Sequence, residues 1–309
     1  MLQKMALEAK KIGVDIIKYQ MHIPEKEMLK NKIKFWGGSL DEILNNYNLS
    51  INDHKKLIAY CKKINIQYLC TPFCPEAVDI LNDLGVEGFK TGSGEMLNLP
   101  LLDRIIKTKK PLILSTGMST LAEVDFIVNY LKKNKAKFLI TNCTSVYPCP
   151  SELVNLNLIN YYKNKYKILV GHSDHTSDIW SSLGAVTLGA NVIEKHFTLS
   201  KALKGPDWEV SLEPNNFKKM IIGAREINKS LKQKKIEKKI NPKELPVRNW
   251  ANHSIVSIKP IKKNEKFTTS NISVKRPSGG LPALDFFKVL NLKSKKNIKE
   301  NQQIKKYHL

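Results

Sequence analysis

The chain has 309 residues and a formal net charge of +23 at pH 7, and its length suits one large domain followed by a small one. Only four of its 51 basic residues are arginine, and the lysines are spread along the whole chain, which argues against a nucleic-acid interface. The five cysteines form no CxxC pair, and no apolar run is long enough to cross a membrane. We therefore expect a cytoplasmic protein with reduced thiols and with neither a nucleic-acid nor a membrane partner.

Short apolar runs alternate with helical patterns over residues 1–231, which predicts βα units and a parallel sheet. After an opening helix that Gly13 ends, helices are predicted over residues 52–64, 75–84, 99–108, 121–134, 156–162, 181–189 and 217–231. The seven predicted strands are centred near Ile17, Leu69, Phe89, Leu114, Leu139, Leu169 and Ile193. A closed TIM-type barrel needs one strand more. Two architectures stay open: a doubly wound open sheet, or a barrel whose first strand is missing from this sequence.

Most predicted strands end in a polar or glycine-containing cluster, and barrel enzymes place their chemistry at the C-terminal ends of the strands. The residue preferences of turns explain a single cluster of this kind, but they do not explain why most of the strands end in one. Lys18 and Lys90 follow apolar strand residues, and Ser93, Ser115 and Ser173 add hydroxyls. Lysines, hydroxyls and backbone N–H groups of glycine turns predict an anion site, and phosphate fits it best. The alternative is that each lysine extends to solvent.

Two histidines end successive predicted strands near the middle of the chain. His175 and His196 are separated by one predicted helix, and Asp174 and Glu194 lie within two residues of them. Neutral imidazole is a common metal ligand, and the same ends of neighbouring parallel strands face one mouth. This pattern predicts an open metal site with room for substrate. The alternative is two polar loop histidines that never meet.

A change of composition divides the chain. Residues 232–246 are highly charged, contain two prolines and are predicted to form a linker. Residues 247–309 contain short β runs and are too few for another barrel. In this module Arg276 lies beside a proline and a glycine pair, where its guanidinium could bind a carboxylate or polar ligand in a bidentate way. The alternative is a surface arginine on a turn.

Nine segments, in order along nearly the whole chain, resemble the bacterial sialic acid synthases, the family of N-acetylneuraminate and N,N'-diacetyllegionaminate synthases. They are KYQMHIPEKEM, CTPF, FKTGSGE, ILSTGMS, NCTSVYP, GHSDHT, EKHFT, KGPDWEVSLEP and VKRPSGG. The resemblance implies a TIM barrel over residues 1–231 and an antifreeze-like SAF domain over residues 247–309. It also implies a domain-swapped homodimer in which the SAF domain of one subunit covers the barrel of the other.

The resemblance further implies a transferase of carbohydrate biosynthesis. Such an enzyme condenses phosphoenolpyruvate with an N-acetylmannosamine-type sugar, or its 2,4-diacetamido-6-deoxy analogue, and water. The products are a nonulosonic (sialic-type) acid and phosphate. A divalent metal, manganese or alternatively magnesium or cobalt, would be held by His175 and His196, and these two residues and Glu194 would be catalytic.

The substrate contacts that the resemblance implies follow the matched motifs. Phosphoenolpyruvate would contact Lys18, Thr71, Lys90, Ser93, Ser115 and Ser173. The sugar would contact Gln20, Tyr147, Glu194 and Asp207, together with Arg276 of the partner subunit. Ser145 would be a further substrate contact, and it stands where family members often carry asparagine.

The sequence departs from the family in two places. The family begins with a strand that bears a glutamate and an Asn-His turn, and no segment here matches it, so we expect that Met1 is not the true start. If Met1 is the start, the alternative function is an inactive relative that binds ligand or serves as a dimer partner. The segment from Phe35 to Ile43 matches the family's sugar-side loop only loosely, so the sugar is not identified, and a pseudaminate synthase is the alternative among enzymes.

Overall fold

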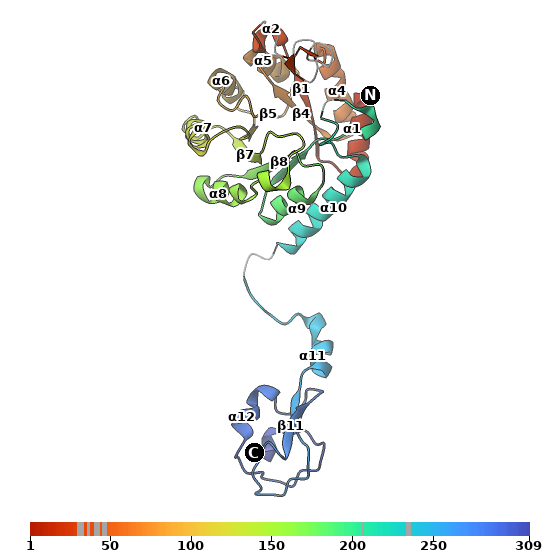
Figure 1. The fold of residues 1–309 in the computed structure, drawn as a ribbon, viewed down its shortest axis with the longest axis vertical. Helices are drawn as coiled ribbons and strands as arrows, with labels where there is room; N and C mark the ends of the chain where they lie inside the picture. Colours follow the sequence, from red (N-terminus) through yellow and green to blue (C-terminus); the bar gives the residue numbers. More distant parts are fainter. Residues whose placement is uncertain (30–33, 36–37, 40–43, 45–47, 206, 233–235) are drawn as a thin grey trace. The chain divides into compact units, whose positions relative to one another are not determined.

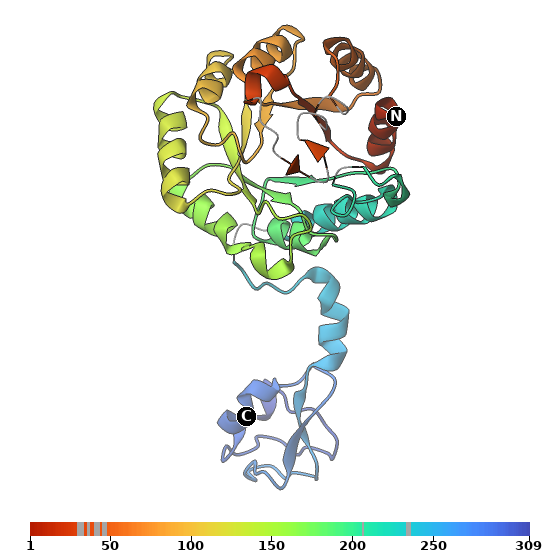
Figure 2. The same cartoon turned by 45° about the horizontal axis from the view of Figure 1, so that its top comes forward.

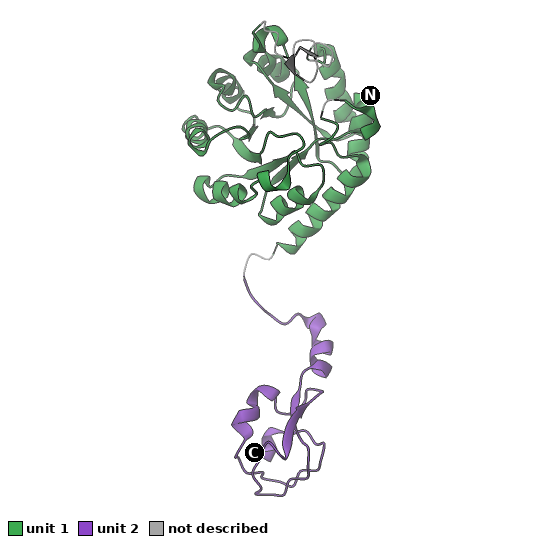
Figure 3. Ribbon diagram, in the orientation of Figure 1, with its two compact units in different colours: residues 1–234 green, residues 235–309 purple. Residues whose placement is uncertain are grey.

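The computed structural model describes residues 1–29, 34–35, 38–39, 44, 48–205, 207–232 and 236–309. The chain forms two compact units, Met1–Lys234 and Lys235–Leu309 (Figure 3). The predicted sugar-side loop from Phe35 to Ile43 lies largely outside the described residues, so its match to the family stays a prediction.

The first unit is built around a parallel sheet, which has seven strands among the described residues. Strand order in the sheet follows chain order, as in a TIM-type barrel. This excludes the doubly wound alternative, which reverses its order at a switch point. The strands are β1 (Ile16–Met21), β4 (Gln67–Pro72), β5 (Phe89–Thr91), β6 (Leu112–Ser115), β7 (Phe138–Cys143), β8 (Val170–Asp174) and β9 (Val192–Lys195). The predicted strands are confirmed, although β8 begins one residue after its predicted centre, Leu169.

Helices follow the strands and form an outer ring around them (Figures 1 and 2). The first and last of these helices, α1 and α10, contact each other. The helices are α1 (Leu2–Ile12), α4 (Ile51–Lys63), α5 (Pro75–Asp83), α6 (Leu99–Lys107), α7 (Leu121–Lys133), α8 (Asn157–Tyr166), α9 (Trp180–Thr187) and α10 (Pro214–Ser230). Ser50 and Thr120 begin α4 and α7 with capping boxes, in which the hydroxyl and a carboxylate three residues later satisfy free backbone N–H groups.

Helix α8 continues beyond its predicted end. The prediction ended α8 at Tyr162, because asparagine and lysine residues dilute its apolar pattern. Ile159, Tyr162 and Tyr166 nevertheless keep helical spacing, and all three are buried. Shorter elements between the larger ones are α2 (Pro24–Glu27), the antiparallel pair β2 (Lys34–Phe35) and β3 (Gly38–Ser39), and the 3₁₀ turns η1 (Ser151–Leu153) and η2 (Lys201–Leu203).

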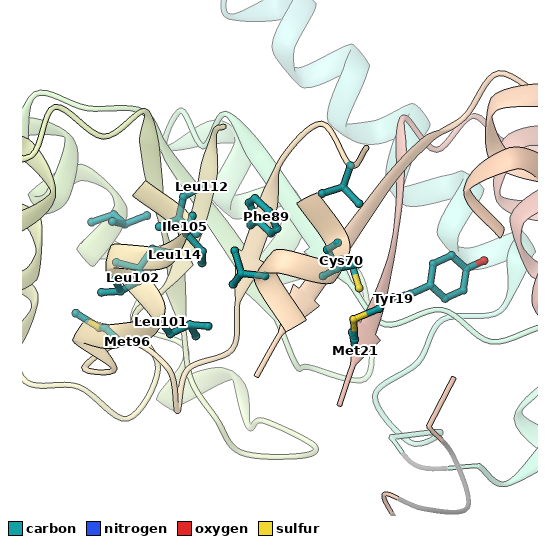
Figure 4. Packing of buried hydrophobic residues seen from close by; sticks show 14 of the residues in the cluster. Tyr19, Met21, Cys70, Phe89, Met96, Leu101, Leu102, Ile105, Leu112 and Leu114 are labelled. Atoms are coloured by element: carbon teal, nitrogen blue, oxygen red, sulfur yellow. The ribbon is translucent and has the colours of Figure 1, made fainter. Parts of the chain in front are cut away.

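Buried apolar side chains on both faces of the sheet form the core of this unit. Figure 4 shows Leu101, Leu102 and Ile105 of α6 beside Leu112 and Leu114 of β6, and all five are at most 2% exposed. Strands that are buried on both faces are expected in a parallel sheet covered by helices. Truncation of one of these leucines to alanine would cost roughly 2–5 kcal/mol. The core therefore holds the strand ends in fixed positions.

A polar pair lies inside this core. The imidazole of His54 on α4 is fully buried, and its Nδ1 lies 2.6 Å from the hydroxyl of Tyr68 on β4. Burial lowers the pKa of His54 to about 4. His54 is therefore uncharged in the folded protein at neutral pH.

Three lysines adopt a left-handed backbone at the ends of helices. Lys109 follows α6, Lys135 follows α7 and Lys167 ends α8, with φ values of 59°, 56° and 55°. Glycine is the usual residue at such positions, because it has no Cβ to clash with the backbone. The helix–strand turns of this chain thus carry side chains where a glycine is common.

The second unit has its own small core. Its elements are η3 (Pro242–Glu244), α11 (Leu245–Ala251), β10 (Ser254–Ser257), β11 (Ile272–Lys275), η4 (Ala283–Asp285), α12 (Phe286–Val289) and η5 (Lys306–His308), with β10 and β11 antiparallel. Ile255, Phe267 and Ile304 are fully buried at its centre. The segment predicted as a linker, residues 232–246, contains η3 and the start of α11. Across the described residues of both units, no helix is long and apolar enough to cross a membrane.

Candidate active site

The predicted site residues of the first unit lie on the C-terminal ends of its strands or in the loops that follow. Parallel strands in register bring these ends to one edge, since Gln20 is opposite Thr71 and Ser173 is opposite Glu194. The strands supply Lys18, Gln20, Thr71, Lys90, Ser115, Ser173 and Glu194, and the loops supply Ser93, Ser145, Tyr147, His175, His196 and Asp207.

Two lysines share one carboxylate at this edge. Lys18 Nζ lies 2.6 Å from Oε1 of Glu194, and Lys90 Nζ lies 3.2 Å from Oε2. Burial raises the pKa of the Glu194 carboxyl, but the charges of Lys18 and Lys90 outweigh this and hold the pKa well below its ordinary range. Burial lowers the pKa of Lys90, and Glu194 partly offsets that effect. The group carries one more positive than negative charge, which suits an anionic ligand.

Serine hydroxyls from three loops and strands lie close to one another near a glycine. Ser93 Oγ lies 2.9 Å from Ser115 Oγ. Gly117 has no side chain, and a Cβ there would overlap Oγ of both Ser93 and Ser145. Buried hydroxyls normally have hydrogen-bond partners, yet those of Thr71 and Ser145 find none among the described residues. A bound ligand that accepts hydrogen bonds would satisfy them.

The imidazole rings of His175 and His196 lie close together. The ring centroids of His175 and His196 are 5.4 Å apart, and the ring of Tyr147 lies 4.1 Å from the first and 6.0 Å from the second. His175 Nδ1 lies 2.8 Å from the carbonyl oxygen of Thr144, so it carries the proton and leaves the Nε2 lone pair free. This excludes the alternative that the two imidazoles lie apart in separate loops.

The imidazole pair fits a divalent metal. Burial, with the nearby charge of Lys18, lowers the pKa of His196 to about 3, so its ring is a neutral ligand. Asp207 Oδ2 lies 3.7 Å from His196 Nδ1. In the part of the chain that is described, no three His, Cys, Asp or Glu side chains form a metal cluster. A metal here would draw two imidazoles from the protein and leave positions for water and substrate.

Comparisons with known proteins identify the family of each unit. Residues 5–236 match the NeuB family, and residues 252–309 match the SAF domain. This chain belongs to the NeuB family. The N,N'-diacetyllegionaminic acid synthase of Campylobacter jejuni is 40% identical over 95% of this chain and 90% of its own length. The pseudaminic acid synthase of Helicobacter pylori is 31% identical over 97% of this chain and 91% of its own.

A solved structure of the same family has the same fold. The N-acetylneuraminic acid synthetase of Leptospira borgpetersenii, in complex with citrate, superposes with a TM-score of 0.74 at 31% identity. The match covers 80% of this chain and 85% of that one. The predicted TIM-type barrel and SAF domain of the NeuB-family chain are therefore confirmed.

Sequence reasoning missed a thiol in the site. Cys143 at the end of β7 has its Sγ 3.6 Å from Ser93 Oγ and 3.9 Å from His175 Nδ1. Burial raises the pKa of this thiol, but the hydrogen bond to His175 and the hydroxyls of Ser115 and Ser93 outweigh it and set the pKa at about 7. The motif NCTS placed this cysteine at a strand end, but only the strand register shows that it faces inward.

A second missed group stands beside Gln20 on β1. His22 Nδ1 lies 2.8 Å from Oε1 of Glu27, and its ring stacks on Phe73 at a centroid distance of 4.0 Å. Nε2 of His22 is 3.5 Å from Oε1 of Gln20. The carboxylate therefore orients the imidazole next to the predicted sugar contact. In the sequence this group is marked only by the MHIPEKE segment.

One carboxylate predicted near the metal lies elsewhere, and one predicted contact is not tested by the structure. Asp174 was considered as a carboxylate near the metal, but it faces away from the histidines and pairs with Lys195, since neighbouring residues of a strand point to opposite faces. Arg276 lies in the second unit, where its guanidinium is 5.4 Å from the ring centre of Trp250. Its contact with the sugar of a partner subunit stays a prediction.

Proposed function

We propose that this NeuB-family chain condenses phosphoenolpyruvate with an N-acetylated mannose-type sugar and water, giving a nonulosonic acid and phosphate. The observation that carries the proposal is the ion-paired group of Lys18, Glu194 and the buried Lys90 beside the His175–His196 pair. It would place an anion site next to a site for a divalent metal. The named relatives, synthases of N,N'-diacetyllegionaminic and pseudaminic acids, support this reaction class.

In the proposed mechanism the cations and hydroxyls hold phosphoenolpyruvate. Lys18 and Lys90 would bind its charged groups, and the hydroxyls of Thr71, Ser93, Ser115 and Ser173 would donate hydrogen bonds to its oxygens. These contacts fix C3 of the substrate toward the histidines. A divalent ion, manganese in our proposal, would be bound by His175 and His196 and would supply Lewis-acid polarisation of the sugar aldehyde.

The bonds change as follows. C3 of phosphoenolpyruvate forms a bond to the aldehyde carbon while the carbonyl π bond breaks, so the aldehyde oxygen becomes an alkoxide and positive charge develops at C2. Water adds to C2, and one of its protons passes to the alkoxide to give the new hydroxyl group. The C2–O bond to phosphate then breaks, and the remaining hydroxyl proton leaves with phosphate as the keto acid forms. Glu194 is held ionised by its two lysines, so it can stabilise the positive charge at C2 but is a poor proton donor. Tyr147, Gln20 and Asp207 would face the sugar.

A test of the proposal measures phosphate release from phosphoenolpyruvate with Mn²⁺ and each candidate sugar. We expect release to require both the metal and a sugar, and the sugars to compare are the 2,4-diacetamido sugar, N-acetylmannosamine and the pseudaminate precursor, since the named relatives include synthases of both legionaminic and pseudaminic acids. His196→Ala should abolish metal-dependent release, whereas His253→Ala, an exposed histidine of the second unit, should not. No release with any sugar would favour the ligand-binding alternative.

We also propose that the protein works in the cytoplasm as a homodimer, with Arg276 of one subunit contacting the sugar in the other. Mixing inactive His196→Ala subunits with inactive Arg276→Ala subunits should then restore activity. A mixed dimer would contain one site with an intact histidine pair and an intact arginine. If the mixture stays inactive after subunit exchange, the proposed sharing of sites between subunits is wrong.

A further inference from the structure

A buried ion pair lies directly behind the two histidines. Asp174 is the last described strand residue of β8 and Lys195 is that of β9, so each immediately precedes one histidine in the chain. The two residues are opposite each other in the strand register. Their side chains are both 0% exposed, and Lys195 Nζ lies 3.1 Å from Asp174 Oδ1. The pair therefore joins the ends of the two strands that carry His175 and His196.

The pair does not line the substrate site. Ser173 and Glu194 face that site, and the next residue on each strand points to the opposite face. On that face Ser182 of α9 donates a hydrogen bond of 2.6 Å to Asp174 Oδ2. The pair thus sits between the sheet and α9.

The same two residues hold the turn around His175. The backbone N–H and the hydroxyl of Thr176 each donate a hydrogen bond of 2.8 Å to Asp174 Oδ1. Lys195 Nζ donates to the carbonyl oxygen of Thr176. The residues on both sides of His175 are therefore held by one cluster, and that cluster includes the residue before His196.

Other contacts fix each histidine singly. The carbonyl oxygen of His175 accepts a hydrogen bond from Cys149 N–H, and that of His196 accepts one from Leu212 N–H, both at 2.9 Å. Asp174 and Lys195 differ from these contacts because their side chains link the two histidine-bearing segments to each other. A buried ion pair generally adds less to stability than apolar residues of the same volume would. The position of the pair suggests a role beyond stability.

We infer that Asp174 and Lys195 are positioning residues that set the separation and orientation of His175 and His196 for a divalent metal. This inference rests on the metal site of the proposed function. Groups behind metal ligands commonly tune metal affinity by orienting those ligands. Here the orientation acts through the backbone of both histidines at once, so loss of the pair should weaken metal binding without changing a ligand.

The test replaces both charges together, because a single replacement leaves a buried charge unpaired. The double variant Asp174→Asn/Lys195→Met keeps nearly the same volumes. We expect its Mn²⁺ dissociation constant, measured by isothermal titration calorimetry, to rise by roughly 10-fold to 100-fold. The absorption spectrum of bound Co²⁺ should change, because it reports ligand geometry. Binding of inorganic phosphate without metal should stay as in the unaltered chain.

Two controls separate positioning from stability. Asp125→Asn/Lys165→Met removes an ion pair of 2.7 Å whose side chains are 35% and 39% exposed. Leu131→Ala lowers stability through a fully buried residue of α7. Both should bind Mn²⁺ with unchanged affinity. If the double variant does not fold, Ser182→Ala removes only the hydrogen bond to Asp174 and should still raise the Mn²⁺ dissociation constant several-fold.

The outcomes distinguish this inference from the proposed function. Unchanged Mn²⁺ affinity and an unchanged Co²⁺ spectrum in a folded pair variant would overturn the inference and leave the proposed function intact. An equal loss of affinity in Leu131→Ala would also overturn it, since the effect would then follow stability. If the unaltered chain binds no Mn²⁺, the metal part of the proposed function fails and the inference fails with it.

Discussion

Gly117 offers a sharp test of the anion site. The substitution Gly117→Ala adds a methyl group that would lie 2.5 Å from Ser145 Oγ and closer still to Ser93 Oγ. Such contacts are too short to persist, but a serine hydroxyl can turn away by rotation about one bond. We therefore expect the protein to stay folded while one or both hydroxyls leave the site.

The size of the effect follows from the lost hydrogen bonds. A hydrogen bond to a charged group contributes roughly 1.5–3 kcal/mol, and about 1.4 kcal/mol corresponds to a tenfold change in a binding constant. Loss of one hydroxyl from bound phosphoenolpyruvate should therefore raise its dissociation constant by about 10-fold to 150-fold. Calorimetric titration measures this constant, and thermal unfolding shows whether the fold is preserved.

A matched control is available nearby in the same site. A Cβ at Gly94, one residue after Ser93, would meet no atom within 4 Å. Gly94→Ala should therefore bind phosphoenolpyruvate within about twofold of the unaltered chain, because it displaces no hydroxyl. If Gly117→Ala binds as tightly as Gly94→Ala, the serine hydroxyls do not hold this ligand and the assignment is refuted.

Two further predictions concern charges in the barrel. Glu194→Gln leaves Lys18 and Lys90 without their carboxylate, so we expect a loss of roughly 1–3 kcal/mol of stability in anion-free buffer. Added phosphate should raise the melting temperature of this variant more than that of the unaltered chain, and equal gains would contradict this. His54 has a folded pKa of about 4, below its unfolded value near 6.5, so the unfolded chain takes up the proton first and stability falls as the pH drops from about 6.5 to 4. Between pH 7 and 5 the loss should be about 2 kcal/mol larger than in His54→Gln, measured by urea unfolding, and identical losses would rule out this linkage.

The fold was largely readable from the sequence because apolar runs and helical patterns alternate without interruption. The pattern left the sheet type open, since it shows which segments are strands but not their order. The resemblance to the sialic acid synthases implied a barrel, and the strand order of the structure and the family match confirm it. The missed last turn of α8 shows the limit of composition, because Tyr166 continues a buried face among polar residues.

The sequence predicted many of the residues that line the site but not which of them form ion pairs. Lys18 and Glu194 come from strands far apart in the chain, and no spacing rule brings their charges together. Asp174 was expected beside a metal, yet a shift of one residue along a strand moves a side chain to the other face. Cys143 was overlooked for the same reason, since the sequence does not say which face it occupies.

The lysines that adopt a left-handed backbone after the helices lower the stability of the fold. A non-glycine residue in this conformation destabilises the fold by roughly 1–2 kcal/mol. Replacement by glycine removes this strain, but the net gain is smaller because glycine loses more conformational entropy on folding. Lys109, Lys135 and Lys167 lie in separate turns, so exchanging all three for glycine should give nearly additive gains. Glycine substitutions at these three turns should therefore stabilise the protein, and the proposed chemistry does not depend on these turns.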